Sequence, residues 1–181
     1  MRRSAAGSAW WSRARGLPPA AYSAWYASLA QFPGRPVRIL AWAEGPGGFV
    51  VGSPAALSWS GGEDAWTHVG WHEIERGGWN AETATLSWIL HGGRRGSVTL
   101  EKPGRLPELF RERIADTIAL ERFVPVAGDR GVIVTARRDL AAGGAISWHS
   151  TLTRGLTWHS EGVQAAADRA MAELRGEYDL R

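Results

Sequence analysis

The sequence predicts an α+β fold in which a small antiparallel β-barrel or strongly bent sheet carries a mid-chain helix and a C-terminal helix. Two observations support this prediction. Between residues 37 and 101, about six short segments alternate apolar and polar residues and are joined by Gly-rich turns, a pattern typical of small barrels and sandwiches. Beyond residue 104, the apolar spacing becomes helical, returns to a period of two, and ends in a second helical stripe.

The length and composition bound the class of protein. The 181 residues fit one domain, expected at 37–181, which can fold without disulfides or metals. The absence of Cys excludes thiolate nucleophiles and thiolate metal sites. No apolar run approaches the ~18 residues of a membrane span, and no signal-peptide core follows the basic N-terminus. We therefore expect a cytoplasmic protein without a transmembrane segment. The excess of Arg over Lys is typical of a GC-rich genome and indicates a bacterial source.

Residues 1–36 are predicted to form a basic arm. The first 38 residues hold six Arg and no acidic residue, whereas the remainder holds 15 Lys and Arg against 18 Asp and Glu. The body is therefore mildly acidic, which argues against a uniformly basic groove for nucleic acid. The arm could contact an anionic surface or a partner through its first Arg residues and a Trp pair: Arg2, Arg3, Trp10, Trp11, Arg13 and Arg15. The alternative is a frayed terminus with no such role.

A short aromatic helix is expected at residues 19–32, between a Pro pair and a Pro–Gly stop. Four large residues share one stripe: Tyr22, Trp25, Tyr26 and Leu29. The opposite face carries no Lys or Arg, whereas a helix on a membrane surface normally carries them there. The helix is therefore expected to dock on an open edge or end of the barrel.

The predicted strands follow one another in short steps: 37–43, 49–53, 55–60, 65–72, 84–90 and 97–101. The glycines of the turn at 45–48 invite a phosphate-loop interpretation, but a strand and not a helix follows them. A helix is expected at 105–118, on the ladder of Leu106, Phe110, Ile114 and Ile118 with Leu109 beside it. Three further strands are expected at 119–150. The last helix carries a stripe of Val163, Ala166, Ala167, Ala170, Met171 and Leu174, with Gly176 as its stop.

The stretch from Ala65 to Leu90 contains four of the eleven Trp residues. By alternation, Trp71 and Trp88 fall on apolar faces and are expected in the core. Trp66 shares a face with two histidines, and Trp79 follows a glycine pair where a strand would bulge or be closely approached. The candidate pocket or surface residues are therefore Trp66, His68, His72 and Trp79.

No set of residues identifies an active site. His68 and His72 are four apart, but in a strand they are separated by ~13 Å, too far to share a metal ion. The tripeptide Trp-His-Ser occurs twice, and a cross-strand pair of His149 and His159 is one interpretation of it; coincidence is the simpler one. No G-x-S-x-G nucleophile elbow is present. We therefore nominate no catalytic residue, no metal ligand and no cofactor.

The segments FVVGSPAALSW and HVGWHEIERGGW resemble bacterial pleckstrin-homology-like (PH-like) domains over residues 37–101. The later segments GRLPELFRERI and GVIVTARR are similar to small actinobacterial proteins of unknown function. Ser53 stands where Thr is more usual in such domains, and Ala56 where Arg is common. The resemblance implies a PH-like fold and little about function, because folds of this kind serve many roles.

The resulting functional prediction is a non-enzymatic interaction module that binds a protein partner, a second copy of itself or an anionic surface. One alternative is weak, salt-dependent nucleic-acid association through the arm. The other is a small-ligand-binding protein or enzyme with a Trp-lined cavity that holds one or more of four histidines: His68, His72, His149 and His159.

Overall fold

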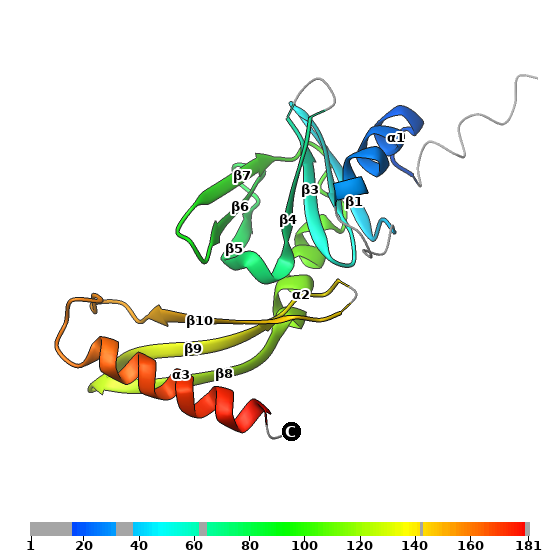
Figure 1. The fold of residues 1–181 in the computed structure, drawn as a ribbon. Helices are drawn as coiled ribbons and strands as arrows, with labels where there is room; N and C mark the ends of the chain where they lie inside the picture. The colour runs from blue at the N-terminus through cyan, green and yellow to red at the C-terminus, as the bar shows by residue number, and fades with distance from the viewer. Residues whose placement is uncertain (1–15, 32–37, 62–64, 142, 180–181) are drawn as a thin grey trace, which may run out of the picture.

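The computed structural model describes residues 16–31, 38–61, 65–141 and 143–179. The fold is α+β, as predicted, with three antiparallel sheets (Figure 1). The first contains β1 (Ala41–Gly45), β2 (Gly48–Gly52), β3 (Ala56–Ser60) and β4 (Trp66–Gly70) in that order. The second contains β5 (Ile74–Asn80), β6 (Thr85–Leu90) and β7 (Arg95–Thr99). The third has the order β10 (Ile146–Leu152), β9 (Arg130–Arg138), β8 (Ile118–Ala127).

Five helical elements accompany these sheets in the described residues: α1 (Pro19–Ser28), the 3-10 turns η1 (Leu29–Gln31) and η2 (Trp71–Glu73), α2 (Leu106–Thr117) and α3 (Val163–Asp179). The first two sheets and α2 form what we call the seven-strand unit. The third sheet, the C-terminal sheet, lies below it in Figure 1, with α2 between them and α3 along the sheet. The strands do not close into a barrel in the part of the chain described.

Aromatic rings fill the space between the first two sheets. Trp71 and Phe110 meet edge to face, with ring centroids 6.0 Å apart, and Trp88 lies 6.4 Å from Phe110. Trp71 and Trp88 are buried, so the prediction that both belong to the core is confirmed. Such rings contribute large apolar areas and favourable edge contacts. Among the described residues, the interior of this unit is therefore packed with aromatic side chains of Trp and Phe.

Helix α1 docks on the outer face of the first sheet. Trp25 is fully buried there against Val51, whose neighbour Val50 faces the opposite side, into the core. The expected docking at an edge or end of a barrel was thus wrong. The predicted stripe is only partly buried, because Tyr22 and Tyr26 stack on each other and remain exposed.

The C-terminal sheet packs one face on α3. Val132, Val134 and Ala136 alternate along β9 and are fully buried, as the period of two predicts. Val132 and Val134 meet an α3 stripe that includes Val163, Ala167 and Leu174. Small residues in that stripe let the helix approach the sheet closely.

Several predicted boundaries were wrong. Helix α3 runs through Gly176, because a single Gly near a helix end costs only about 1 kcal/mol and packing on the sheet continues. Ile118 begins β8 and is exposed, so it does not belong to the ladder of α2. The first strand begins at Ala41, and the strand expected to reach His72 ends at Gly70. The irregularity of β5 lies between Ile74 and Arg76, so no bulge forms at the glycine pair, but the alternative expectation of a close approach is confirmed at Gly77.

The glycine pair of β5 offers a matched test of close packing. A Cβ atom on Gly77 would lie 2.5 Å from the carbonyl oxygen of Ser87 and 2.7 Å from the Phe110 ring, whereas nothing lies within 4 Å of one on Gly78. We expect Gly77→Ala to lower the free energy of unfolding by about 1–3 kcal/mol, because backbone and core must shift. Gly78→Ala should change it by no more than about 0.5 kcal/mol. Urea denaturation of both variants checks this, and equal effects would contradict the packing described.

Candidate functional site

A pocket of about 510 Å³ opens where the seven-strand unit meets the C-terminal sheet. We call it the junction pocket. Its walls come from η2, from the end of β6 and the turn after it, and from β10: His72, Glu73, Leu90, His91, Gly92, Arg94, Ser147 and His149. Three of the five histidines of the chain therefore converge on one site from elements far apart in the sequence.

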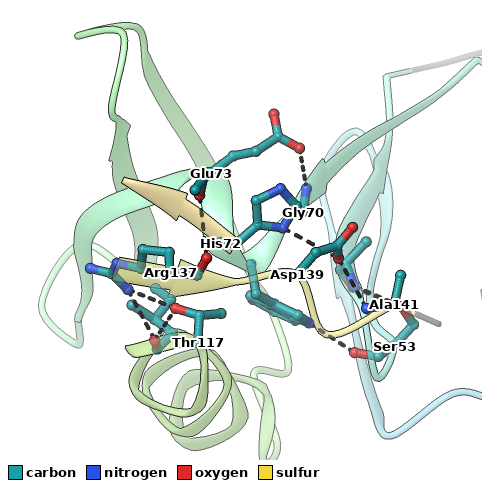
Figure 2. Close-up of polar contacts among 12 residues, drawn as sticks. Ser53, Gly70, His72, Glu73, Thr117, Arg137, Asp139 and Ala141 are labelled. Atoms are coloured by element: carbon teal, nitrogen blue, oxygen red, sulfur yellow. Dashed lines mark hydrogen bonds and ion pairs between the residues drawn. The ribbon is translucent and has the colours of Figure 1, made fainter. Parts of the chain in front are cut away.

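The 3-10 turn η2 places His72 in this pocket. Trp71 is its anchor: the indole nitrogen donates to the Ser53 carbonyl at 2.9 Å, and the ring is buried. The Glu73 carboxylate accepts a hydrogen bond from the Gly70 amide at 2.8 Å and fixes the start of the turn (Figure 2). Because His72 follows the buried Trp, its ring points away from the core and toward Asp139, which lies just after β9.

His72 and Asp139 link the two parts of the protein. The Nδ1 atom of His72 is 3.3 Å from Oδ1 of Asp139 (Figure 2). This is an ion-pair distance when the imidazole is protonated, although the angle does not satisfy a hydrogen bond. The same carboxylate accepts from the Ala141 amide at 2.9 Å, which holds it in place. The pair therefore connects η2 to the loop that follows β9.

His91 and His149 stack on each other across the junction. Their ring centroids are 3.5 Å apart and the planes differ by 9°. The backbone of His91 is fixed because its amide donates to the Glu73 carbonyl at 3.1 Å. His149 is fixed by its register opposite Thr135 in β9, and its Nε2 lies 2.9 Å from the Ser147 hydroxyl. Two rings held this close avoid charge repulsion only while at least one is neutral.

The environment disfavours protonation of the stacked rings. The pKa of His91 is lowered from 6.5 to about 4, first by burial and then by the nearby positive groups His149, Arg137 and His72. Burial also lowers the pKa of His149, with Arg137 and His72 contributing. The Nε2 atom of His91 is buried and makes no hydrogen bond within the described structure. Burial and nearby positive charge therefore favour the neutral forms of His91 and His149 in this pocket.

Arg137 contributes to this positive field and connects the C-terminal sheet to α2 and β5. It extends from β9, is 5% exposed, and donates to the Ile114 carbonyl at 3.0 Å and the Thr117 hydroxyl at 2.8 Å at the end of α2. A third bond reaches the Glu75 carbonyl of β5 at 3.1 Å. Burial lowers the pKa of Arg137, while the carboxylates of Glu121 and Glu75 oppose that shift. A cation is favourable at a helix C-terminus, where carbonyls lack partners.

The structure separates the residues that the sequence grouped together. His68 lies under α1, with Ser28 Oγ 3.0 Å from one ring nitrogen and Ser58 Oγ 2.7 Å from the other. Trp66 packs in the cluster around Trp25, and Trp79 packs on the core of the seven-strand unit. Only His72 of that group reaches the junction pocket.

The remaining candidates also lie apart. His149 is in β10, whereas His159 is exposed in the loop before α3, so the two do not form a cross-strand pair. The arm residues Arg2, Arg3, Trp10, Trp11, Arg13 and Arg15 lie outside the described residues.

Sequence reasoning missed His91, Arg94 and Arg137. The first two belong to a segment read only as a Gly-rich turn, and turns of this kind give no periodicity from which to infer contacts. Arg137 alternates with Val132, Val134 and Ala136 and thus falls on the other face of β9. Alternation could identify that face, but it could not show that α2 and β5 cover it.

The low pKa of His91 predicts a specific pH dependence of stability. The unfolded chain binds a proton at His91 near pH 6.5, while the folded protein resists it until about pH 4. The stabilising contribution is therefore complete above pH 6.5 and is lost as the pH falls to 4. Since the ring is partly exposed, we expect about 1–2 kcal/mol from this group, less than the full value of about 1.4 kcal/mol per pH unit.

The measurement is urea denaturation at pH 7 and pH 4 of the wild type and two variants. His91→Gln should lose less free energy of unfolding than the wild type over this interval, by about 1–2 kcal/mol. His159→Gln, at an exposed position, should behave like the wild type. The carboxylates that also titrate between pH 4 and pH 7 are common to all three proteins and cancel in the comparison. Equal pH dependence in all three proteins would contradict the assignment.

Among the described residues, no three His, Asp or Glu side chains are arranged to hold a metal ion, the junction pocket included. No described helix has both the length and the apolar character needed to cross a bilayer. Comparison with protein-family models, curated proteins and solved structures finds no match to this chain.

Proposed function

We propose that this protein is a non-enzymatic ligand-binding module whose junction pocket binds a small molecule bearing an oxyanion, such as a carboxylate, sulfate or phosphate group. The observation that carries the proposal is the convergence of His72, His91 and His149 with Arg94 in one pocket. Imidazole, guanidinium and hydroxyl groups are the side chains that bind oxyanions by hydrogen bonds.

The charges around the pocket favour an anion. Arg94 lines it without an ion pair to any described carboxylate, and Arg137 lies close enough to lower the pKa of both stacked rings. Glu73, which lines the pocket, and Asp139, which lies beside His72, each accept a hydrogen bond from a backbone amide, of Gly70 and Ala141 respectively. An anion would offset the positive field of Arg94 and Arg137.

The volume and position of the pocket support a small ligand over a large surface. About 510 Å³ is within the range of pockets that hold small molecules, roughly 300–1,000 Å³. Such pockets are frequent where two structural units meet. A bound ligand would touch η2, the β6–β7 turn and β10 at once, and would thereby stabilise the junction.

The geometry favours binding over catalysis. Ser147 and His149 lie within hydrogen-bonding distance at 2.9 Å, which is the contact that a nucleophile and its base require. His149, however, stacks on His91, and no carboxylate hydrogen bond to it is found within the described ranges. A third group that orients the base is therefore not part of the arrangement.

We propose in addition that the seven-strand unit is a PH-like domain, on the resemblance of residues 37–101. The support is a four-stranded and a three-stranded antiparallel sheet in chain order, followed by α2, which packs against both. The interaction role predicted from the sequence would then reside in the junction pocket. It would not depend on the basic arm.

The proposal is tested by titrating the full-length protein with inorganic sulfate at pH 6 and following backbone amide NMR shifts. We expect shifts at Gly92, Arg94 and His149, and an affinity about tenfold lower in Arg94→Ala, because a charge-assisted hydrogen bond contributes about 1.5 kcal/mol. Arg154→Ala, at an exposed position in the loop after β10, is the matched control and should retain the affinity. Equal affinities in the two variants, or no shifts in the pocket, would overturn the proposal.

A further inference from the structure

A second hollow lies on the outer face of the β5–β6–β7 sheet, separate from the junction pocket. It measures about 540 Å³ and takes three consecutive residues from each strand: Arg76, Gly77, Gly78, Ser87, Trp88, Ile89, Arg95, Gly96 and Ser97. The strand register arranges its outward-facing residues in two rows across the sheet. One row is Arg76, Ile89 and Arg95, and the next is Gly78, Ser87 and Ser97. We call this site the arginine groove.

Small residues create the hollow. Gly78 has no side chain, and Ser87 and Ser97 are short and exposed, so the second row leaves the backbone of the sheet uncovered. The first row is taller because Arg76 and Arg95 flank Ile89 on either side. The base of the hollow therefore consists of backbone and hydroxyl groups. Along one side lie two guanidinium groups with the apolar Ile89 between them.

The polar groups of the groove are available to a ligand. Neither the hydroxyls of Ser87 and Ser97 nor the guanidinium of Arg95 bonds to another described residue. Arg76 has only a long contact, 3.9 Å, with its neighbour Glu75, and its side chain is 71% exposed. No Asp or Glu lines the groove. The site therefore offers two guanidinium groups and two hydroxyl groups to acceptors, and its charge is complementary to carboxylates.

The spacing of the two arginines defines the shape of the ligand. Neighbouring strands lie about 4.8 Å apart, so the backbones of Arg76 and Arg95 are separated by about 10 Å, with Ile89 between them. A peptide in the polyproline II conformation rises about 3.1 Å per residue with three residues per turn. Residues i and i+3 then face the same side about 9 Å apart, close to the separation of the two arginines.

We propose that the arginine groove docks an extended acidic segment of a partner protein that carries two carboxylates three residues apart. The first 15 residues of this chain cannot be the occupant on electrostatic grounds, because they contain Arg and no acidic residue. This surface goes beyond the oxyanion pocket of the proposed function: the adjacent arginines Arg94 and Arg95 serve different sites, the first in the junction pocket and the second in the groove.

The test is fluorescence anisotropy of the full-length protein with labelled 12-residue peptides of equal charge. One peptide carries two Glu at i and i+3 with Leu between them, and the other carries the same residues with the two Glu adjacent. We expect the first to bind at least fivefold more tightly, and both Arg76→Gln and Arg95→Gln to reduce that affinity five- to tenfold. Arg169→Gln, an exposed position of α3, is the control for charge and should leave binding unchanged.

Four results would overturn the proposal: equal affinity for the two peptides, equal loss in Arg95→Gln and Arg169→Gln, loss of peptide binding in Arg94→Ala, or tighter binding of a single-stranded oligonucleotide than of the first peptide. The last result would assign the groove to phosphates of nucleic acid instead. The Arg94→Ala variant separates this test from the proposed function. Peptide binding that persists in Arg94→Ala supports a groove independent of the junction pocket, and its loss in that variant would contradict it.

Discussion

Replacing Arg137 by Met is expected to lower the free energy of unfolding by about 3 kcal/mol, the largest effect that we predict for a single polar residue. The side chain is 5% exposed and donates to Ile114, Thr117 and Glu75. Met fills a similar volume but removes the donor to the Glu75 carbonyl and to the Thr117 hydroxyl oxygen, and leaves the Ile114 carbonyl only its bond from Thr117. A buried acceptor left without a donor costs about 1–3 kcal/mol. Urea denaturation at pH 7 measures the loss. Arg138→Met, at the exposed end of the same strand, should change stability by less than about 0.5 kcal/mol.

A double-mutant cycle identifies the bond to α2 as part of this effect. The Thr117 hydroxyl accepts from Arg137 and donates to the Ile114 carbonyl at 2.6 Å. Thr117→Val alone should cost about 1–2 kcal/mol, and clearly less when Arg137 is already Met. Strictly additive losses would show that the two side chains do not act together. The connection between α2 and the C-terminal sheet would then rest on other contacts.

Replacing Trp25 by Ala is expected to lower the free energy of unfolding by about 3–4 kcal/mol, because a fully buried Trp leaves a large cavity. Tyr26→Ala is the control in the same helix. Its side chain is 53% exposed, so the loss should stay below about 1 kcal/mol. Urea denaturation and amide hydrogen exchange measure both variants. In Trp25→Ala, exchange should accelerate in α1 and leave the core strand β3 protected. Equal losses at the two positions would show that the whole aromatic stripe is docked.

The sequence allows the strands and helices to be predicted because their periods are local properties. Val132, Val134 and Ala136 identify the buried face of β9, and Leu106, Leu109 and Phe110 identify that of α2. The same reasoning placed Trp71 and Trp88 in the core. Each of these residues packs against a strand or helix whose own apolar residues are equally regular in spacing.

The junction pocket could not be predicted in this way. Its formation depends on which face of the C-terminal sheet meets the seven-strand unit, and periodicity defines a face without defining what covers it. His72 points into the pocket because the chain leaves β4 at Gly70 and forms a 3-10 turn, where a straight strand was expected. His91 lies in a turn, where the sequence has no apolar periodicity from which its contacts could be inferred. Such residues become recognisable only when the sheets are placed side by side.

The central claim, that the junction pocket binds an oxyanion, is tested most directly by the pKa of His91 with and without sulfate. Sulfate keeps its charge between pH 4 and pH 8, so imidazole NMR shifts report the ring alone. A bound anion should raise the pKa of His91 from about 4 by about one unit, because an opposite charge stabilises the imidazolium. The rise should disappear in Arg94→Ala and persist in Arg154→Ala. The same pKa for His91 with and without sulfate would contradict the claim.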